Sequence, residues 1–263
     1  TGTSNVAMGS FALLSNTTGD ENTALGQNSL DANTTANANT AVGFNALTEN
    51  TTGANNTGVG RTALSSSTTG SSNTALGKDA LATNTTADNN TAVGRSALVS
   101  NSTGANNTAV GMNALDANTS ADNNTAVGKS ALTDNTTGAG NTAVGLQALA
   151  SNTTASNNTA VGLNSLVAAT TGGSNCAFGI SSMFTNTTGA GNTAVGQDSL
   201  YALTEADNNV AVGKGSGVAV TTGEQNTILG QACAEALTTG SDNIAIGHDA
   251  ADNLTTGGQN IAI

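Results

Sequence analysis

The feature of this sequence that most restricts its fold is a 17-residue repeat that runs through the chain without one insertion or deletion. A disordered repeat can drift in length, whereas stacked coils cannot, because each residue must lie above its counterpart. The register therefore predicts a solenoid. The tract that marks it, Asn-Thr-Ala-Val-Gly and close variants, ends at Gly9, Gly26, Gly43, Gly60, Gly77, Gly94, Gly111, Gly128, Gly145, Gly162, Gly179, Gly196, Gly213, Gly230 and Gly247.

The residues inside one repeat indicate β-structure. We number repeat positions from the Asn that opens each tract, so that Asn5 is at repeat position 1. Thr, Val, Ile or Cys at position 2, a small residue at position 3, an apolar residue at position 4 and Gly at position 5 are typical of a short strand that ends in a turn. Seventeen residues are too few for the helical repeats of 33 or 34 residues. We predict an all-β chain, a parallel β-solenoid of about 15.5 stacked coils, with 1–263 as one solenoid domain.

Two unvarying positions are candidates for a structural ladder. Stacked Asn side chains can hydrogen-bond to one another along the axis, as amides do in cross-β assemblies. The Gly at position 5 supplies a backbone conformation or a close approach that a Cβ would obstruct. We assign both columns a structural role and no catalytic one. The ladder residues are Asn5, Asn22, Asn39, Asn90, Asn107, Asn124, Asn141 and Asn158, with Gly9, Gly26, Gly43, Gly94, Gly111 and Gly128.

The row at position 3 suggests that one chain is not the whole assembly. Side chains at positions 2 and 4 lie on one face of the strand and those at position 3 on the other. Position 3 is Ala in fourteen of sixteen copies and is never charged, which is unexpected for a row that faces solvent. A strand restricted on both faces is covered on both, once by its own coil and once by a partner. We therefore expect a homo-oligomer, with three-fold symmetry favoured.

The charges fall at variable positions and limit the classes of partner. All five basic residues are at position 6, at Arg61, Lys78, Arg95, Lys129 and Lys214. The acids gather mainly at positions 7, 10, 11, 16 and 17, which we interpret as exposed edges of the coil. A net charge of -12 argues against nucleic acid and against an anionic membrane surface. The calcium-binding Gly-Gly-x-Gly-x-Asp repeat does not occur, and we predict neither a metal nor a cofactor.

No catalytic arrangement can be assembled from these residues. His248 is the single histidine and occupies variable position 6. Cys176 and Cys233 lie three to four coils apart, too far for a disulfide between stacked coils. We predict that the protein is not an enzyme.

Acceptor patterns for N-glycosylation occur at position 12, and we attribute them to the Asn- and Thr-rich repeat itself, although glycosylation stays open. They begin at Asn16, Asn33, Asn50, Asn84, Asn118, Asn135, Asn152 and Asn186. Thr arrays can also order water, but no Thr-x-Thr row recurs, so an ice- or glycan-binding role is a minor alternative.

The tracts Asn5–Gly9, Asn209–Gly213 and Asn243–Gly247 resemble the Ser-Val-Ala-Ile-Gly repeat of YadA-like heads in trimeric autotransporter adhesins. The repeats as a whole are similar to those of phage tail-fibre and bacterial surface proteins. The resemblance spans the chain and implies a left-handed, trimeric β-roll displayed outside the cell or on a virion, which binds a host-surface protein or glycan. The repeat of that family is about three residues shorter, and its neck, coiled-coil stalk and membrane anchor do not occur in this sequence.

Two irregular regions remain. We interpret 1–208 as regular coils and 209–263 as variant coils at a junction, because Leu at position 9 gives way there to Gly217, Ala234 and Ala251. Apolar residues also stack at positions 6 and 10 and form a candidate contact patch or an intersubunit packing surface. This patch comprises Leu163, Ile180, Val167, Phe184, Tyr201 and Val218.

These observations predict a structural or adhesive fibre segment, the head or shaft of a cell-surface adhesin or a phage tail fibre, which acts as a rigid spacer and an attachment surface. The alternative is a subunit of a self-assembling extracellular filament or sheath. No membrane-spanning run occurs, so no direct membrane insertion is expected. Because the chain opens and closes partway through a repeat, we expect a segment of a longer protein.

Overall fold

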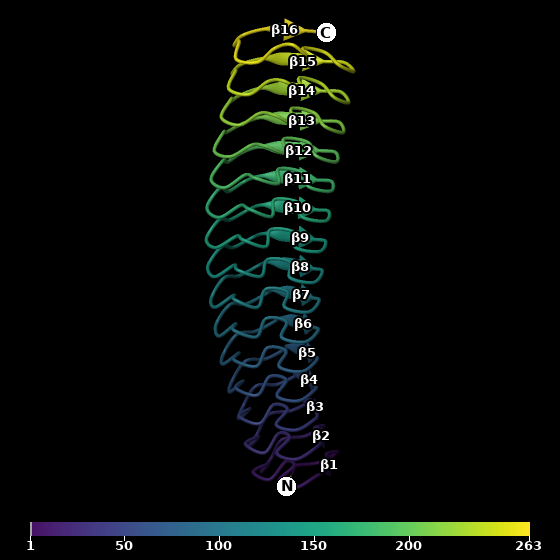
Figure 1. Cartoon of the computed structure of the whole chain (residues 1–263). Helices are drawn as coiled ribbons and strands as arrows, with labels where there is room; N and C mark the ends of the chain where they lie inside the picture. Colours follow the sequence, from purple (N-terminus) through teal and green to yellow (C-terminus); the bar gives the residue numbers. More distant parts are fainter. Residues whose placement is uncertain (1) are drawn as a thin grey trace. The chain divides into compact units, whose positions relative to one another are not determined.

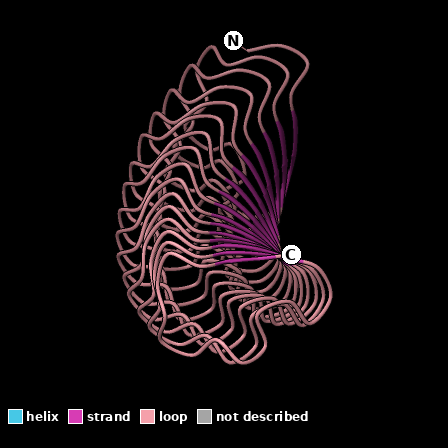
Figure 2. Cartoon of the chain, turned by 90° about the horizontal axis from the view of Figure 1, so that it is seen from above, coloured by secondary structure: helices cyan, strands magenta, loops and turns pink. Residues whose placement is uncertain are grey.

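The structure is a computed structural model and describes residues 2–263. Within that range the chain is all-β, with sixteen short strands in sequence order and no helix. Each 17-residue coil contributes one parallel strand, and loops and turns make up the rest of the coil (Figures 1 and 2). The predicted parallel β-solenoid is confirmed.

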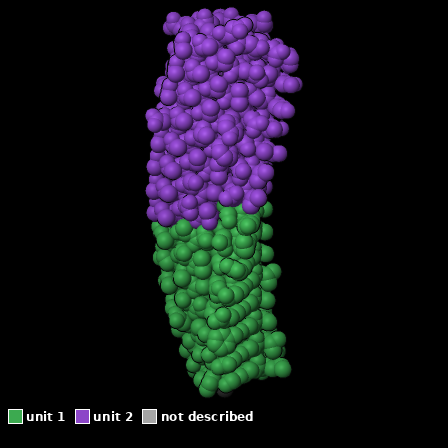
Figure 3. Space-filling view, in the orientation of Figure 1, with its two compact units in different colours: residues 1–130 green, residues 131–263 purple. Residues whose placement is uncertain are grey.

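The chain divides into two compact units, Thr1–Ser130 and Ala131–Ile263 (Figure 3). Each unit is a parallel β-solenoid in itself. The strands of the first unit are β1 (Val6–Met8), β2 (Thr23–Leu25), β3 (Thr40–Val42), β4 (Thr57–Val59), β5 (Thr74–Leu76), β6 (Thr91–Val93), β7 (Thr108–Val110) and β8 (Thr125–Val127). Those of the second are β9 (Thr142–Val144), β10 (Thr159–Val161), β11 (Cys176–Phe178), β12 (Thr193–Val195), β13 (Val210–Val212), β14 (Thr227–Leu229), β15 (Ile244–Ile246) and β16 (Ile261–Ala262).

Backbone hydrogen bonds explain why the repeat length does not vary. In β6 and β7, Thr91 pairs with Thr108 and Val93 with Val110, each 17 residues apart. Coils are also bonded outside the strands, as where the Thr68 amide donates to the Thr85 carbonyl at 2.9 Å. A coil with one residue more or fewer would leave such buried groups without partners, which is costly.

The core is a stack of small residues against one column of Leu. Ala at position 3 and a small residue at position 8 are buried, and so is Leu at position 9, as at Leu98 with 0% exposure. The backbone φ is +51 at Leu98, and it is +49 and +52 at Leu81 and Leu115, which occupy the same position in the neighbouring coils. A left-handed conformation costs a non-glycine residue about 1–2 kcal/mol, and complete burial of a Leu offsets this by about 2–3 kcal/mol.

The structure shows which face of the strand lies inside the coil. Ala at position 3 points into the coil and is buried, whereas the side chains at positions 2 and 4 point outward. A Cβ at Gly58, which occupies position 3, would lie 3.3 Å from Cγ of Leu47 in the preceding coil. Ala therefore fits against the Leu column and a larger residue does not. Packing within the chain explains the Ala row, so that row is no evidence for a partner.

The variant coils support this account of the core. In the second unit, Gly217 replaces the position-9 Leu, and Ile228 in the next coil replaces the position-3 Ala. Cδ1 of Ile228 lies 2.8 Å from where a Gly217 Cβ would be, and Cγ2 of Val220 lies 3.3 Å from the same point. Ile228 and Val220 together fill the volume that the Leu leaves, because cores tolerate changes that conserve volume.

A left-handed backbone also recurs at position 17, which gives a test of the coil conformation. Ala38 has a φ of +58, and Gly140 and Gly191 at the same position have φ of +69 and +68. We expect Ala38→Gly to stabilise its coil by about 0.5 kcal/mol, because relief of left-handed strain exceeds the entropy that Gly loses on folding.

The measurement is native-state hydrogen exchange at neighbouring amides. Ala54→Gly is the matched control at position 16, where φ is not positive, and we expect it to destabilise by about 0.5 kcal/mol. Equal effects of the two substitutions would contradict the assigned conformation.

Candidate interaction surface

The outward face of the sheet is the principal candidate surface. Position 2 contributes mostly Thr, and position 4 contributes Val, Leu, Ile, Met or Phe in every coil. The position-4 side chains of Leu76 and Phe178 are 48% and 40% exposed, which is high for residues that usually lie in a core. Each unit therefore presents a continuous apolar column to its surroundings, and contiguous apolar surface of this kind marks interaction sites.

Position 6 lies beside this face, at the C-terminal end of each strand. In the second unit it carries Leu146, Leu163 and Ile180, which are 43%, 40% and 49% exposed. These side chains widen the apolar column of position 4 in three successive coils. The five cations occupy the same position in other coils.

The predicted contact patch separates into two columns. Leu163 and Ile180 belong to the outward face described above. Val167, Phe184, Tyr201 and Val218 lie in the turn segment beyond the buried position 9 and are half-buried. The rings of Phe184 and Tyr201 stack on each other, with centroids 5.1 Å apart and an angle of 4° between planes. Because each ring covers a face of the other, this pair packs neighbouring coils together.

The position-1 Asn column binds mainly to the backbone. The side chain of Asn90 is fully buried. Its Nδ2 donates to the Gly104 carbonyl at 2.8 Å, and its Oδ1 accepts from the Asn107 amide at 2.9 Å. Bonds between neighbouring side chains of the predicted kind accompany this pattern in part of the chain, as from Asn243 Nδ2 to Asn226 Oδ1 at 3.0 Å.

The other predicted ladder residues bind the backbone in the same way. The side-chain Nδ2 donates to the carbonyl 14 residues later in the chain at 2.8–2.9 Å, and in several coils Oδ1 accepts from the backbone amide of the next position-1 Asn. The residues are Asn5, Asn22, Asn39, Asn107, Asn141 and Asn158. The backbone amide of Asn124 donates to Oδ1 of Asn107 at 2.9 Å.

A second amide column, at position 12, was not recognised from the sequence. Asn33 Nδ2 donates both to the Ala36 carbonyl at 3.1 Å and to Asn16 Oδ1 at 3.0 Å. These are the Asn residues of the glycosylation pattern, and those from Asn33 to Asn186 are fully buried. In the folded chain their amide nitrogens are inaccessible to a transferase. The sequence signal for this column is the Asn at position 12 followed by Gly or Ala at position 15, whose carbonyl accepts the bond from Nδ2.

The position-5 Gly column requires glycine. At the six predicted ladder glycines φ lies between +134 and +142, a region that L-residues rarely adopt. A Cβ at Gly9, Gly26, Gly43 or Gly111 would lie 2.4–2.5 Å from the carbonyl oxygen of the next Gly in the column. The backbones of adjacent coils thus approach each other directly at this position.

Acids at position 16 have a structural contact that the sequence did not reveal. Oδ1 of Asp122 accepts from the Ala105 amide of the preceding coil at 2.7 Å, and Ser241 makes a comparable bond through its hydroxyl to the Glu224 amide. Two hydrogen bonds from Thr3 lower the pKa of the Asp20 carboxyl, the larger effect coming from the backbone amide and the smaller from the hydroxyl. Short polar side chains at this position therefore satisfy turn amides.

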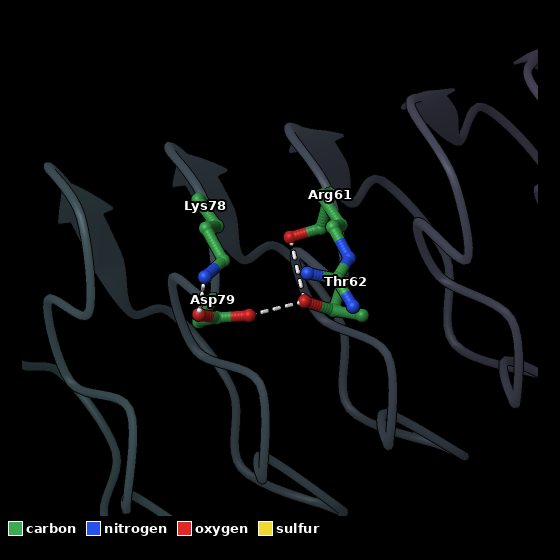
Figure 4. A network of polar contacts seen from close by, with 4 residues as sticks. All are labelled: Arg61, Thr62, Lys78 and Asp79. Atoms are coloured by element: carbon green, nitrogen blue, oxygen red, sulfur yellow. Dashed lines mark hydrogen bonds and ion pairs between the residues drawn. The ribbon is translucent and has the colours of Figure 1, made fainter.

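Two coils share a polar contact beside the sheet (Figure 4). The Thr62 hydroxyl donates to Oδ1 of Asp79, and Nζ of Lys78 lies 3.4 Å from Oδ2 of the same carboxylate. The hydrogen bond from Thr62 holds the pKa of Asp79 below its usual value, and Lys78 and Arg61 act in the same direction. The ion pair is exposed, so its contribution to stability is small.

The remaining candidate groups are dispersed. His248 is exposed and lies 3.0 Å from Asp249. Cys176 and Cys233 are both free thiols, and burial raises the pKa of the Cys233 thiol. Residues 2–263 contain no pocket and no group of three metal-binding side chains. Over the same range no helix has the length and apolar character needed to span a membrane.

The arrangement defines a class by architecture: a parallel β-solenoid of 17-residue coils with an outward apolar sheet face. No family model matches this chain, and no curated protein matches its sequence.

Proposed function

We propose that this chain is a structural and adhesive fibre segment, which associates through its outward sheet face into a homo-oligomer, with a trimer favoured. The observation that carries the proposal is the apolar column at position 4, which remains exposed in both units. Burial of apolar side chains contributes about 25 cal/mol per Å², so a column repeated in every coil gains stability with each added layer.

The proposed setting is outside the cell or on a virion, in the head or shaft of a surface adhesin or a tail fibre. Stacked coils with buried amide ladders and invariant length suit a spacer, because each coil is held by its neighbours. The faces of the coil that the oligomer leaves free would provide the attachment surface for a host-surface protein or glycan.

Sedimentation velocity and light scattering test this proposal. We expect a discrete species of three chains of 25.3 kDa, about 76 kDa. A Leu163→Asp/Ile180→Asp variant should dissociate, because each charge would be buried without a partner. A matched Thr171→Asp/Thr188→Asp variant, at exposed position 14 of the same coils, should keep the parent mass. A monomeric parent chain would refute the proposal, and an indefinite ladder of masses would favour the filament alternative.

The outward Thr column gives one reason to consider ice binding. The position-2 hydroxyls, such as those of Thr91 and Thr108, make no hydrogen bond to any other residue in 2–263. However, successive strands within each unit fan out when viewed from above (Figure 2). A twisted array matches a flat ice lattice poorly and a partner sheet with the same twist well. The outward face therefore favours a protein partner.

A further inference from the structure

The charges that border the outward sheet face form matched pairs within single layers. Three strands have an Asp at position 16 just before them and a cation at position 6 just after them. The pairs are Asp88 and Arg95 around β6, Asp122 and Lys129 around β8, and Asp207 and Lys214 around β13. Each layer thus carries a negative charge at one edge of its apolar strip and a positive charge at the other.

The three cations of these layers have no partner in their own chain. Arg95, Lys129 and Lys214 form no ion pair within residues 2–263. The two other cations, Arg61 and Lys78, have no acid at position 16 or 17 before their strands, β4 and β5. These two instead lie beside Asp79 of their own chain (Figure 4). The three cations that lack a counter-charge within their own chain are therefore the ones whose strand has an Asp at its other end.

The acids of these layers are held in place through one carboxylate oxygen, and the other oxygen stays free. Oδ1 of Asp88, Asp122 and Asp207 each accepts a backbone amide of the preceding coil at 2.7 Å. That bond fixes the carboxylate at the edge of the sheet and leaves Oδ2 available to a cation. Ala54 and Ala105 occupy the same position in other coils, so the fold does not require a carboxylate there.

We propose that a second copy of this chain packs on the outward sheet face in parallel and in register, so that each position-16 Asp pairs with the position-6 cation of its neighbour in the same layer. Rotation about an axis along the solenoid brings the acidic edge of one copy to the basic edge of the next, in a dimer or a trimer. An antiparallel arrangement would place like edges together and would repel. This inference rests on the proposed homo-oligomer and adds its polarity and register.

Charge reversal on the full chain tests the pairing. Arg95→Glu/Lys129→Glu/Lys214→Glu should weaken association at least about tenfold at low salt, since like charges would meet at the interface. Adding Asp88→Lys/Asp122→Lys/Asp207→Lys to that variant exchanges the two edges and should restore the parent affinity. The control, Arg61→Glu/Lys78→Glu, changes cations without an in-layer acid and should leave association within about twofold.

Zero-length carbodiimide cross-linking of mixed isotope-labelled and unlabelled chains tests the register. We expect links between Lys129 and Asp122, and between Lys214 and Asp207, that join differently labelled chains. Links from Lys129 to acids of distant layers, or failure of the six-residue exchange to restore association, would overturn parallel packing while leaving a discrete oligomer and the proposed function intact. A parent chain that is monomeric at every salt concentration would overturn both.

Discussion

Gly94→Ala is expected to lose about 4 kcal/mol of local stability, a large effect for the addition of one methyl group. Gly94 has a φ of +134, and an added Cβ would lie 2.5 Å from the carbonyl oxygen of Gly111. The obstructing atoms belong to the backbone of the next coil, so no side-chain movement relieves the contact. The coils must separate, which also weakens the bond from the Gly111 amide to the Val93 carbonyl, 2.8 Å long.

Hydrogen exchange at the amides around β6 and β7 measures this loss. A residue-resolved method is needed because a repeat array need not unfold in one cooperative step. The control is Gly140→Asn, at position 17 with a φ of +69, where several other coils have Asn. We expect the control to stay within about 1 kcal/mol of the parent. Unchanged protection in Gly94→Ala would show that the coils are not in direct backbone contact there.

Asn90→Ala is expected to cost about 3 kcal/mol. The substitution removes the acceptor of the buried Asn107 amide and the donor to the Gly104 carbonyl, and it leaves a small cavity. The Gly104 carbonyl keeps one bond, from Asn101 Nδ2 at 2.8 Å, whereas the Asn107 amide loses its side-chain partner. Accelerated exchange of the Asn107 amide is therefore the most direct readout.

Two further variants separate the two halves of the Asn90 amide. Asn90→Asp preserves an acceptor for Asn107 but turns a second oxygen toward the Gly104 carbonyl, so at neutral pH it should destabilise at least as much as Asn90→Ala. Asn89→Gly, at the adjacent exposed position, should change stability by less than about 0.5 kcal/mol. If Asn89→Gly and Asn90→Ala had equal effects, the amide column would have no special role.

Some parts of the candidate surface could be found in the sequence and others could not. The cations of position 6 and the aliphatic pair Leu163 and Ile180 stand out in an aligned repeat, because polarity changes there from copy to copy. The contact of Asp122 with a turn amide is invisible in the sequence, since the amide belongs to a different coil. The pairing of edges within one layer became apparent only once each strand had a defined beginning and end.

What the sequence determined by itself was the period and the strand. The 17-residue spacing has no exception, so only stacked coils keep each position-5 Gly, such as Gly94, and each position-1 Asn, such as Asn90, above its counterpart. What only the tertiary structure decided was which face of the strand is inside. A period of two allows both choices, and the hydrophobicity of Val93 favours the wrong one. The coil is too narrow beside the Leu column for anything larger than Ala92 in most coils, so the Ala row is buried and the aliphatic row faces outward.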